Sequence, residues 1–174
     1  MKIDITPEEV IAIFAAWLKT PEPSVVASSP FSGPVMKMVQ SAFDGIMREI
    51  GSKPPELGGW LLGPVGERLV THFVLDTSGV CSPTKWVFGA QDANRMLREY
   101  VPLRVDMKGF VHSHPSGITS LSSQDLKAFR RPFDNRKNVG LTEVLAPIVV
   151  DGKIYPYILY REAVKPVLAQ IVIC

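Results

Sequence analysis

Residues 109–125, with the sequence GFVHSHPSGITSLSSQD, are the most informative stretch of this 174-residue chain. The apolar residues before His112 predict a strand that leads directly into that histidine. Side chains at positions i and i+2 of a strand point to the same face of a sheet, so His112 and His114 are placed to bind one metal ion. The following loop is rich in Ser, Gly and Thr and can turn back, which brings Asp125 beside the two histidines.

The chemistry expected of this set is that of a catalytic metal site. Two imidazole nitrogens and one carboxylate leave the fourth position of a tetrahedral zinc ion open, as catalytic zinc sites require. A metal-bound water also needs a general base, for which Glu56, just before Gly58-Gly59 at the start of a predicted strand, is the candidate. Position alone does not distinguish Glu56 from the other acidic residues. Ser122 is the candidate for a hydroxyl that donates to the oxyanion of a tetrahedral intermediate.

Each of these residues also has a simpler interpretation. Taken as an isolated pair, His112 and His114 would more often be hydrogen-bonded core histidines than metal ligands. The spacing of Ser122 and Asp125 is that of an ordinary helix N-cap, a role that does not prevent either side chain from facing a metal. Only the combination of residues points to a metal centre.

Hydrophobic periodicity and turn residues predict the elements around this stretch. Helices are expected at Thr6 to about Thr20, from near Ser32 to Ile50, at Ala90–Tyr100 and at Ser122–Arg130. Strands are expected at 58–63, 69–75, 105–111, 141–150, 154–160 and 167–173, with 76–86 as a loop. Asp151-Gly152 is a strong signal for a tight hairpin turn. The mixture of helices and strands without strict alternation indicates an α/β or α+β sandwich.

The chain is predicted to have two parts. Residues 21–34 contain four prolines and four serines and are interpreted as a linker or irregular loop. Residues 1–32 are therefore an N-terminal helical extension with its linker, and residues 33–174 are the main domain.

Bulk composition limits the classes of function. The hydrophobic fraction is 46%, the charged fraction is 21% and the formal net charge is +2, so charge alone predicts neither nucleic-acid nor membrane binding. The N-terminus is not of the signal-peptide type, and no apolar run is long enough for a membrane helix. Two cysteines, Cys81 and Cys174, do not form a disulfide framework. A reduced, cytoplasmic location is the expectation.

The charge is less even between residues 94 and 137. This segment contains nine lysines or arginines against four acidic residues. The basic residues form either a solvated face or a docking surface for an acidic partner.

Taken together, the segment from His112 to Pro115, then Ser122 and Asp125, matches the complete motif of the JAMM metalloproteases, also called the JAB or MPN family. Glu56 resembles the upstream glutamate of that family. The resemblance covers about residues 33–162. It implies a cytidine-deaminase-like, three-layer α/β sandwich in which helices flank a mixed sheet, here with an additional N-terminal helix.

The resemblance also implies a function. One zinc ion per chain would be bound by His112, His114 and Asp125, with Glu56 as acid and base and Ser122 at the oxyanion. Members of the family cleave isopeptide or peptide bonds after the C-terminal glycine of a ubiquitin-like protein. The short chain resembles the prokaryotic branch, in which some members act beside E1-like and E2-like proteins, including in antiviral defence systems.

Other functions stay open at this stage. The N-terminal helix has no counterpart in the minimal domain of the family. Residues 114–117 also resemble the related RadC branch, although Ser113 and Gly109 favour the JAB branch. The same site would suit a zinc hydrolase of a small amide, and some family members are non-catalytic scaffolds.

Overall fold

The computed structural model describes residues 33–51, 56–82, 85–87, 89–134 and 136–174. The predicted N-terminal helix and linker lie outside these residues. The described α-helices are α2 (Gln40–Ile50), α3 (Ala90–Tyr100) and α4 (Ser123–Asp134). None of the described helices is both long enough and apolar enough to cross a bilayer.

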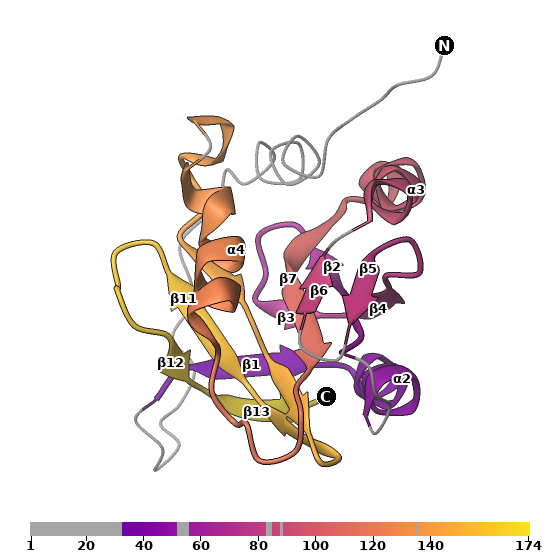
Figure 1. The fold of residues 1–174 in the computed structure, drawn as a ribbon. Coiled ribbons are helices and arrows are strands. Elements are labelled where there is room, and N and C mark those ends of the chain that lie inside the picture. Colours follow the sequence, from indigo (N-terminus) through magenta and orange to yellow (C-terminus); the bar gives the residue numbers. More distant parts are fainter. Residues whose placement is uncertain (1–32, 52–55, 83–84, 88, 135) are drawn as a thin grey trace.

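A mixed eight-stranded sheet forms the centre of the molecule (Figure 1). Its members are β2 (Gly58–Pro64), β4 (His72–Leu75), β7 (Val105–Ser113), β8 (Glu143–Leu145), β9 (Ile148–Val150), β10 (Lys153–Tyr155), β11 (Tyr157–Tyr160) and β12 (Val167–Leu168). The long strand β7 pairs antiparallel with β2 on one side and parallel with β8 and β9 on the other. The mixed α/β class expected from the sequence is therefore confirmed.

A second, three-stranded parallel sheet has the order β13-β1-β3. Its strands are β1 (Val35–Met38), β3 (Leu69–Val70) and β13 (Gln170–Ile173). A short hairpin of β5 (Val80–Ser82) and β6 (Lys85–Val87) stands apart from both sheets.

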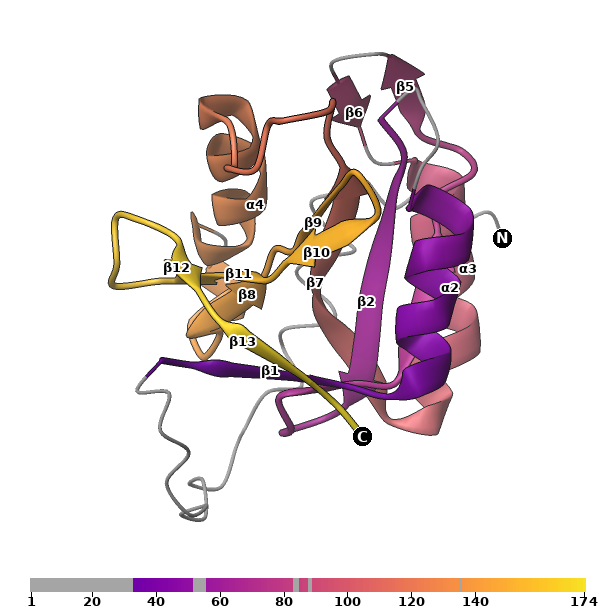
Figure 2. The same ribbon diagram turned by 90° about the horizontal axis from the view of Figure 1, so that it is seen from below.

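The central sheet has an apolar cluster on each face because successive side chains of a strand alternate. On one face Trp60 and Phe110 pack against Phe129 of α4. On the other face Leu61 and Val111 pack against the buried side of α2. Figures 1 and 2 show α4 and α2 on opposite sides of β2 and β7.

Several element predictions are confirmed. Helix α3 has the predicted bounds, and α4 begins one residue after the predicted start and continues four residues further. Asp151 and Gly152 join β9 to β10 with positive φ angles of 48° and 72°, the conformation of the tight hairpin turn that the dipeptide favours.

The predicted helix from near Ser32 to Ile50 is wrong in its first part. Residues 35–38 form strand β1, and only Gln40–Ile50 are helical. Met36 and Met38 are fully buried, and the strand pairs with β13 and β3. Pairing with β3 and with the much more distant β13 outweighs the helical pattern of the local sequence, which contains no information on these partners.

The other corrections concern strands that were not predicted and predicted strands that are divided in two. The predicted loop 76–86 contains β5 and most of β6. The predicted strands 141–150 and 154–160 are each divided, at Pro147 and Pro156, because proline has no N–H to donate to the ladder. The predicted strands 69–75 and 167–173 each divide between the two sheets.

Part of the basic segment 94–137 serves the fold itself. Lys108 is buried beside Asp106, with Nζ 2.6 Å from the carboxylate, and Arg95 pairs with Asp92 at 2.8 Å. Arg130 donates to backbone carbonyls beyond β11, including that of Ala163 at 2.7 Å. Lys108 and Arg130 are therefore used by the fold, whereas the Arg95 side chain is still 44% exposed. Cys81 and Cys174 are both free thiols.

Gly109 gives a test of how tightly the central sheet is packed. A Cβ at this position would lie 1.9 Å from the carbonyl oxygen of Leu145 on the neighbouring strand. Gly109→Ala is expected to lower the free energy of unfolding by about 1–3 kcal/mol or more, because backbone must shift to admit the methyl group. Denaturant unfolding measures this change. Gly45→Ala in α2 is the matched control, since its Cβ would meet Phe73 at an ordinary 3.5 Å; an equal loss in both variants would contradict the packing argument.

Candidate metal centre

His112 lies near the end of β7, between β2 and β9. It is opposite Gly58 on β2 and Ile148 on β9. Phe110 and His112 share one face of the strand, so the imidazole points toward α4 and is only 1% exposed. Its position follows from the apolar run that the sequence analysis used.

His114 follows directly after β7, and its side chain is only 4% exposed. Its backbone N–H donates to the carbonyl of Val149 at 2.9 Å, which continues the pairing with β9 by one residue. Its Nδ1 lies 3.2 Å from the carbonyl oxygen of Ile118 in the loop that follows. A carbonyl partner requires the proton on Nδ1, so the lone pair of Nε2 is available to a metal.

Asp125 is brought to the histidines by the first turn of α4. The N–H of Ser122 donates to Asp125 Oδ2 at 2.7 Å, and the N–H of Asp125 donates to Ser122 Oγ at 3.1 Å. This reciprocal pair is the N-terminal cap that the spacing predicted. The cap also fixes the carboxylate, which then faces the two imidazoles.

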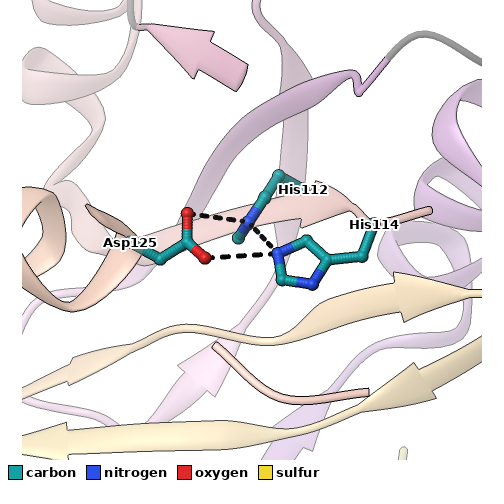
Figure 3. Close-up of side chains that lie close together, drawn as sticks. All are labelled: His112, His114 and Asp125. Atoms are coloured by element: carbon teal, nitrogen blue, oxygen red, sulfur yellow. Dashed lines mark hydrogen bonds and ion pairs between the residues drawn. The ribbon is translucent and has the colours of Figure 1, made fainter. Parts of the chain in front are cut away.

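The three side chains converge on one point (Figure 3). The two Nε2 atoms are 2.8 Å apart, and each lies 3.3 Å from an oxygen of Asp125. In a tetrahedral site with bonds of about 2.0–2.2 Å, ligand atoms are separated by about 3.3–3.6 Å. Each Nε2 atom lies at this separation from one oxygen of Asp125, although the two oxygens differ, and the two Nε2 atoms are closer together than the range. One ligand atom from each residue lies within 4.8 Å of the others, so a small turn of the carboxylate would let the three residues hold a zinc-sized ion.

The electrostatics of the cluster agree with this assignment. Burial lowers the pKa of His112, which keeps the imidazole neutral at neutral pH. Burial also opposes the charged form of His114, but the hydrogen bond and charge of Asp125 outweigh it, and the pKa is raised. Burial would raise the pKa of Asp125, whereas hydrogen bonds from both histidines and Ser122 lower it far below its usual range. The site thus combines a firmly ionised carboxylate with at least one neutral imidazole, as metal ligation requires.

Glu56 lies close enough to this cluster to interact with its charges. Burial raises the pKa of the Glu56 carboxyl, His114 lowers it and Asp125 raises it, with a net upward shift. A raised carboxyl pKa suits a residue that accepts and returns a proton near neutral pH. The charges of His114 and Asp125 thus act on Glu56, and its catalytic role stays a prediction.

Ser122 is exposed at the start of α4. Its oxygen accepts the N–H of Asp125, a bond that leaves the hydroxyl hydrogen for another acceptor. The cap role is observed. The oxyanion role is compatible with it and stays a prediction.

Ser113 is a site residue that the sequence analysis did not assign. Its backbone N–H donates to the carbonyl of Leu57 at 2.8 Å, and its Oγ accepts the N–H of Leu57 at 3.0 Å. These bonds hold the residue next to Glu56 against β7. The alternation of a strand, which points Ser113 away from the two histidines, was the available signal.

Trp86 and Asp76 were also missed. The indole of Trp86 stacks on the imidazole of His112, with ring centroids 6.0 Å apart and planes at 22°. Its Nε1–H donates to Asp76 at 3.1 Å. No local pattern in the sequence marks either residue, because the contact depends on how the β5–β6 hairpin folds back.

Comparisons with known proteins support the fold and not a function. No family model matches the chain, and no curated protein matches it in sequence. The solved structure of protein DSY2949 from Desulfitobacterium hafniense is similar, with a TM-score of 0.61 and 13% identity over 80% of this chain and 92% of that one. AF2198, a JAB1/MPN domain protein from Archaeoglobus fulgidus, gives a TM-score of 0.45 and 18% identity over 79% of this chain and 99% of that one. At a TM-score below 0.5, this second likeness carries no argument about the chain. The first shows that the arrangement of elements occurs in a solved structure, and the case for a function rests on the site.

Proposed function

We propose that the chain is a zinc-dependent hydrolase of amide bonds, and more specifically a peptidase or isopeptidase that cleaves after the C-terminal glycine of a ubiquitin-like protein. The observation that carries the hydrolase is the convergence of His112, His114 and Asp125 on one point. The resemblance of their spacing to the JAMM motif supports the proposal that the cleaved bond is a peptide or isopeptide bond and that the substrate is a ubiquitin-like protein. E1-like and E2-like proteins are the proposed functional partners.

The chemistry assigns a separate task to each residue. A zinc ion bound by the three ligands would supply Lewis acidity and lower the pKa of a coordinated water toward about 7. Glu56 accepts the proton of the attacking water and returns it to the leaving amine. The Ser122 hydroxyl donates to the oxygen that carries negative charge in the tetrahedral intermediate.

A cleavage assay tests the proposal. Zinc-loaded protein is incubated with a ubiquitin-like protein joined through its C-terminal glycine either to a fluorogenic amine or to a lysine side chain, and separately with a short glycyl-glycyl fluorogenic amide. Release from the protein substrates is expected. A zinc chelator should abolish it, and added zinc should restore it, because the water and the leaving group are activated only in the metal-bound site.

The other outcomes separate the alternatives. Cleavage of the short amide without cleavage of either protein conjugate would replace the isopeptidase by a small-amide hydrolase. Stoichiometric zinc without cleavage of any substrate would contradict the proposal and favour a scaffold. Activity that survives complete removal of the metal would contradict the mechanism.

A further inference from the structure

His112 differs from His114 in how its ring is held. A metal-binding histidine ordinarily donates its second N–H to an acceptor, which fixes the orientation of the ring. His114 has such a partner in the carbonyl of Ile118. His112 Nδ1 is buried, and within the described parts of the chain no hydrogen-bond partner reaches it. The orientation of this imidazole therefore needs another cause.

Aromatic rings contact the His112 imidazole on two sides. Trp86 stacks on it nearly parallel, with centroids 6.0 Å apart. Phe129 of α4 meets it edge to face, at 5.3 Å and 73°. Phe129 is in turn stacked on Phe110 at 5.3 Å, so this side belongs to the rigid core. Stacked and edge-to-face contacts restrict the tilt of a ring.

Unlike Phe129, Trp86 comes from the β5–β6 hairpin, and a hydrogen bond to Asp76 holds its indole in place. Its Nε1–H donates to Asp76, which is 3% exposed. The same carboxylate oxygen accepts the backbone N–H of Gly89 at 2.9 Å, on the far side of the hairpin. The N–H of Asp76 donates to the carbonyl of Gly58 at 3.0 Å. Asp76 thus ties the indole and the end of the hairpin together through its carboxylate, and joins them to β2 through its backbone N–H.

The strand opposite His112 provides the space for the indole. Gly58 pairs with His112 in the β2–β7 register. A Cβ on Gly58 would lie 2.4–2.5 Å from three atoms of the Trp86 ring. Any larger residue at position 58 would displace the indole from the imidazole.

We propose that Trp86, held by Asp76 and seated on Gly58, is a positioning residue that fixes the His112 imidazole for metal binding. It takes the place of the hydrogen-bond acceptor that a metal-binding histidine ordinarily has. The proposal rests on the metal site of the proposed function, and it makes the β5–β6 hairpin part of that site.

The test is metal affinity, measured by competition with a chromophoric chelator, together with the visible absorption spectrum of the Co²⁺-loaded protein. Trp86→Ala is expected to weaken Zn²⁺ binding about 10–100-fold, the usual range for loss of outer-shell support. Gly58→Ala should weaken binding in the same direction, although the tryptophan is still present. Both variants should shift the Co²⁺ bands, because the angle of one ligand changes.

Matched variants separate positioning from general damage. Val87→Ala changes the next residue of the hairpin, which is 42% exposed, and should leave affinity and spectrum unchanged. Thermal unfolding of each metal-free variant reports on the fold. Should Trp86→Ala fail to fold, Trp86→Phe and Asp76→Leu decide. Phenylalanine has no N–H to donate to Asp76, and leucine keeps a similar size but has no oxygen to accept the indole N–H. Weakened metal binding is expected in both.

Wild-type affinity and an unchanged Co²⁺ spectrum in folded Trp86 and Gly58 variants would overturn the positioning role and leave the proposed function intact. A wild-type protein that binds no metal would overturn both. Equally weakened metal binding in Val87→Ala would also overturn the positioning role of Trp86, because the effect would then come from the hairpin as a whole.

Discussion

Replacing Glu56 by glutamine is expected to lower kcat for amide cleavage by about 10²–10⁴-fold, the usual contribution of a general acid–base residue. Glutamine keeps the size and polarity of the side chain but cannot accept the proton of the attacking water. Glu56 is not one of the three residues whose ligand atoms converge. Bound zinc should therefore stay at one equivalent, and KM should change little. Steady-state kinetics with metal analysis of the same sample measures both quantities.

Glu67→Gln is the control for this variant, because Glu67 is exposed and its side chain is not part of the metal cluster. It should retain wild-type kcat and zinc. A Glu56→Gln protein with full zinc and undiminished cleavage would show that another group moves the proton. Loss of zinc in that variant would instead show that Glu56 supports the metal.

Replacing Asp125 by alanine is expected to weaken zinc binding more than 100-fold, beyond the 10–100-fold range for outer-shell changes. It removes the only anionic ligand among the three residues and both oxygens that face His112 and His114. Activity should fall with metal occupancy. Isothermal titration or chelator competition gives the affinity, and metal analysis gives the occupancy.

The helix cap complicates this variant, and Ser122→Ala separates the two effects. Both substitutions remove one half of the reciprocal cap, which costs about 0.5–2 kcal/mol of stability. Ser122→Ala should lose that stability yet keep its zinc. If Ser122→Ala and Asp125→Ala lost zinc equally, the capped helix end, and not the carboxylate, would be the cause.

The metal ligands could be predicted from the sequence because their geometry is local. Two histidines at i and i+2 beyond an apolar strand share a face by strand geometry alone. Asp125 lies only three residues after Ser122, in the first turn of a helix whose start the capping pattern marks. These short-range rules are insensitive to the rest of the fold.

The features that could not be predicted depend on long-range pairing. Strand β1 is formed because β13 and β3 flank it, and its own residues also suit the start of a helix. The contact of Trp86 with His112 requires the β5–β6 hairpin to fold back onto β7. Local pattern contains no information on such contacts, so the residues that hold a site are harder to predict than the residues that form it. The predicted extension at residues 1–32 lies outside the described part of the chain.

Anomalous X-ray diffraction from crystals of the zinc-loaded protein, recorded on both sides of the zinc absorption edge, tests directly whether His112, His114 and Asp125 bind zinc. The structure predicts one strong peak per chain, about 2.0–2.2 Å from His112 Nε2, His114 Nε2 and an oxygen of Asp125. A crystal with zinc bound by other residues, or with no zinc between these three side chains, would contradict the account.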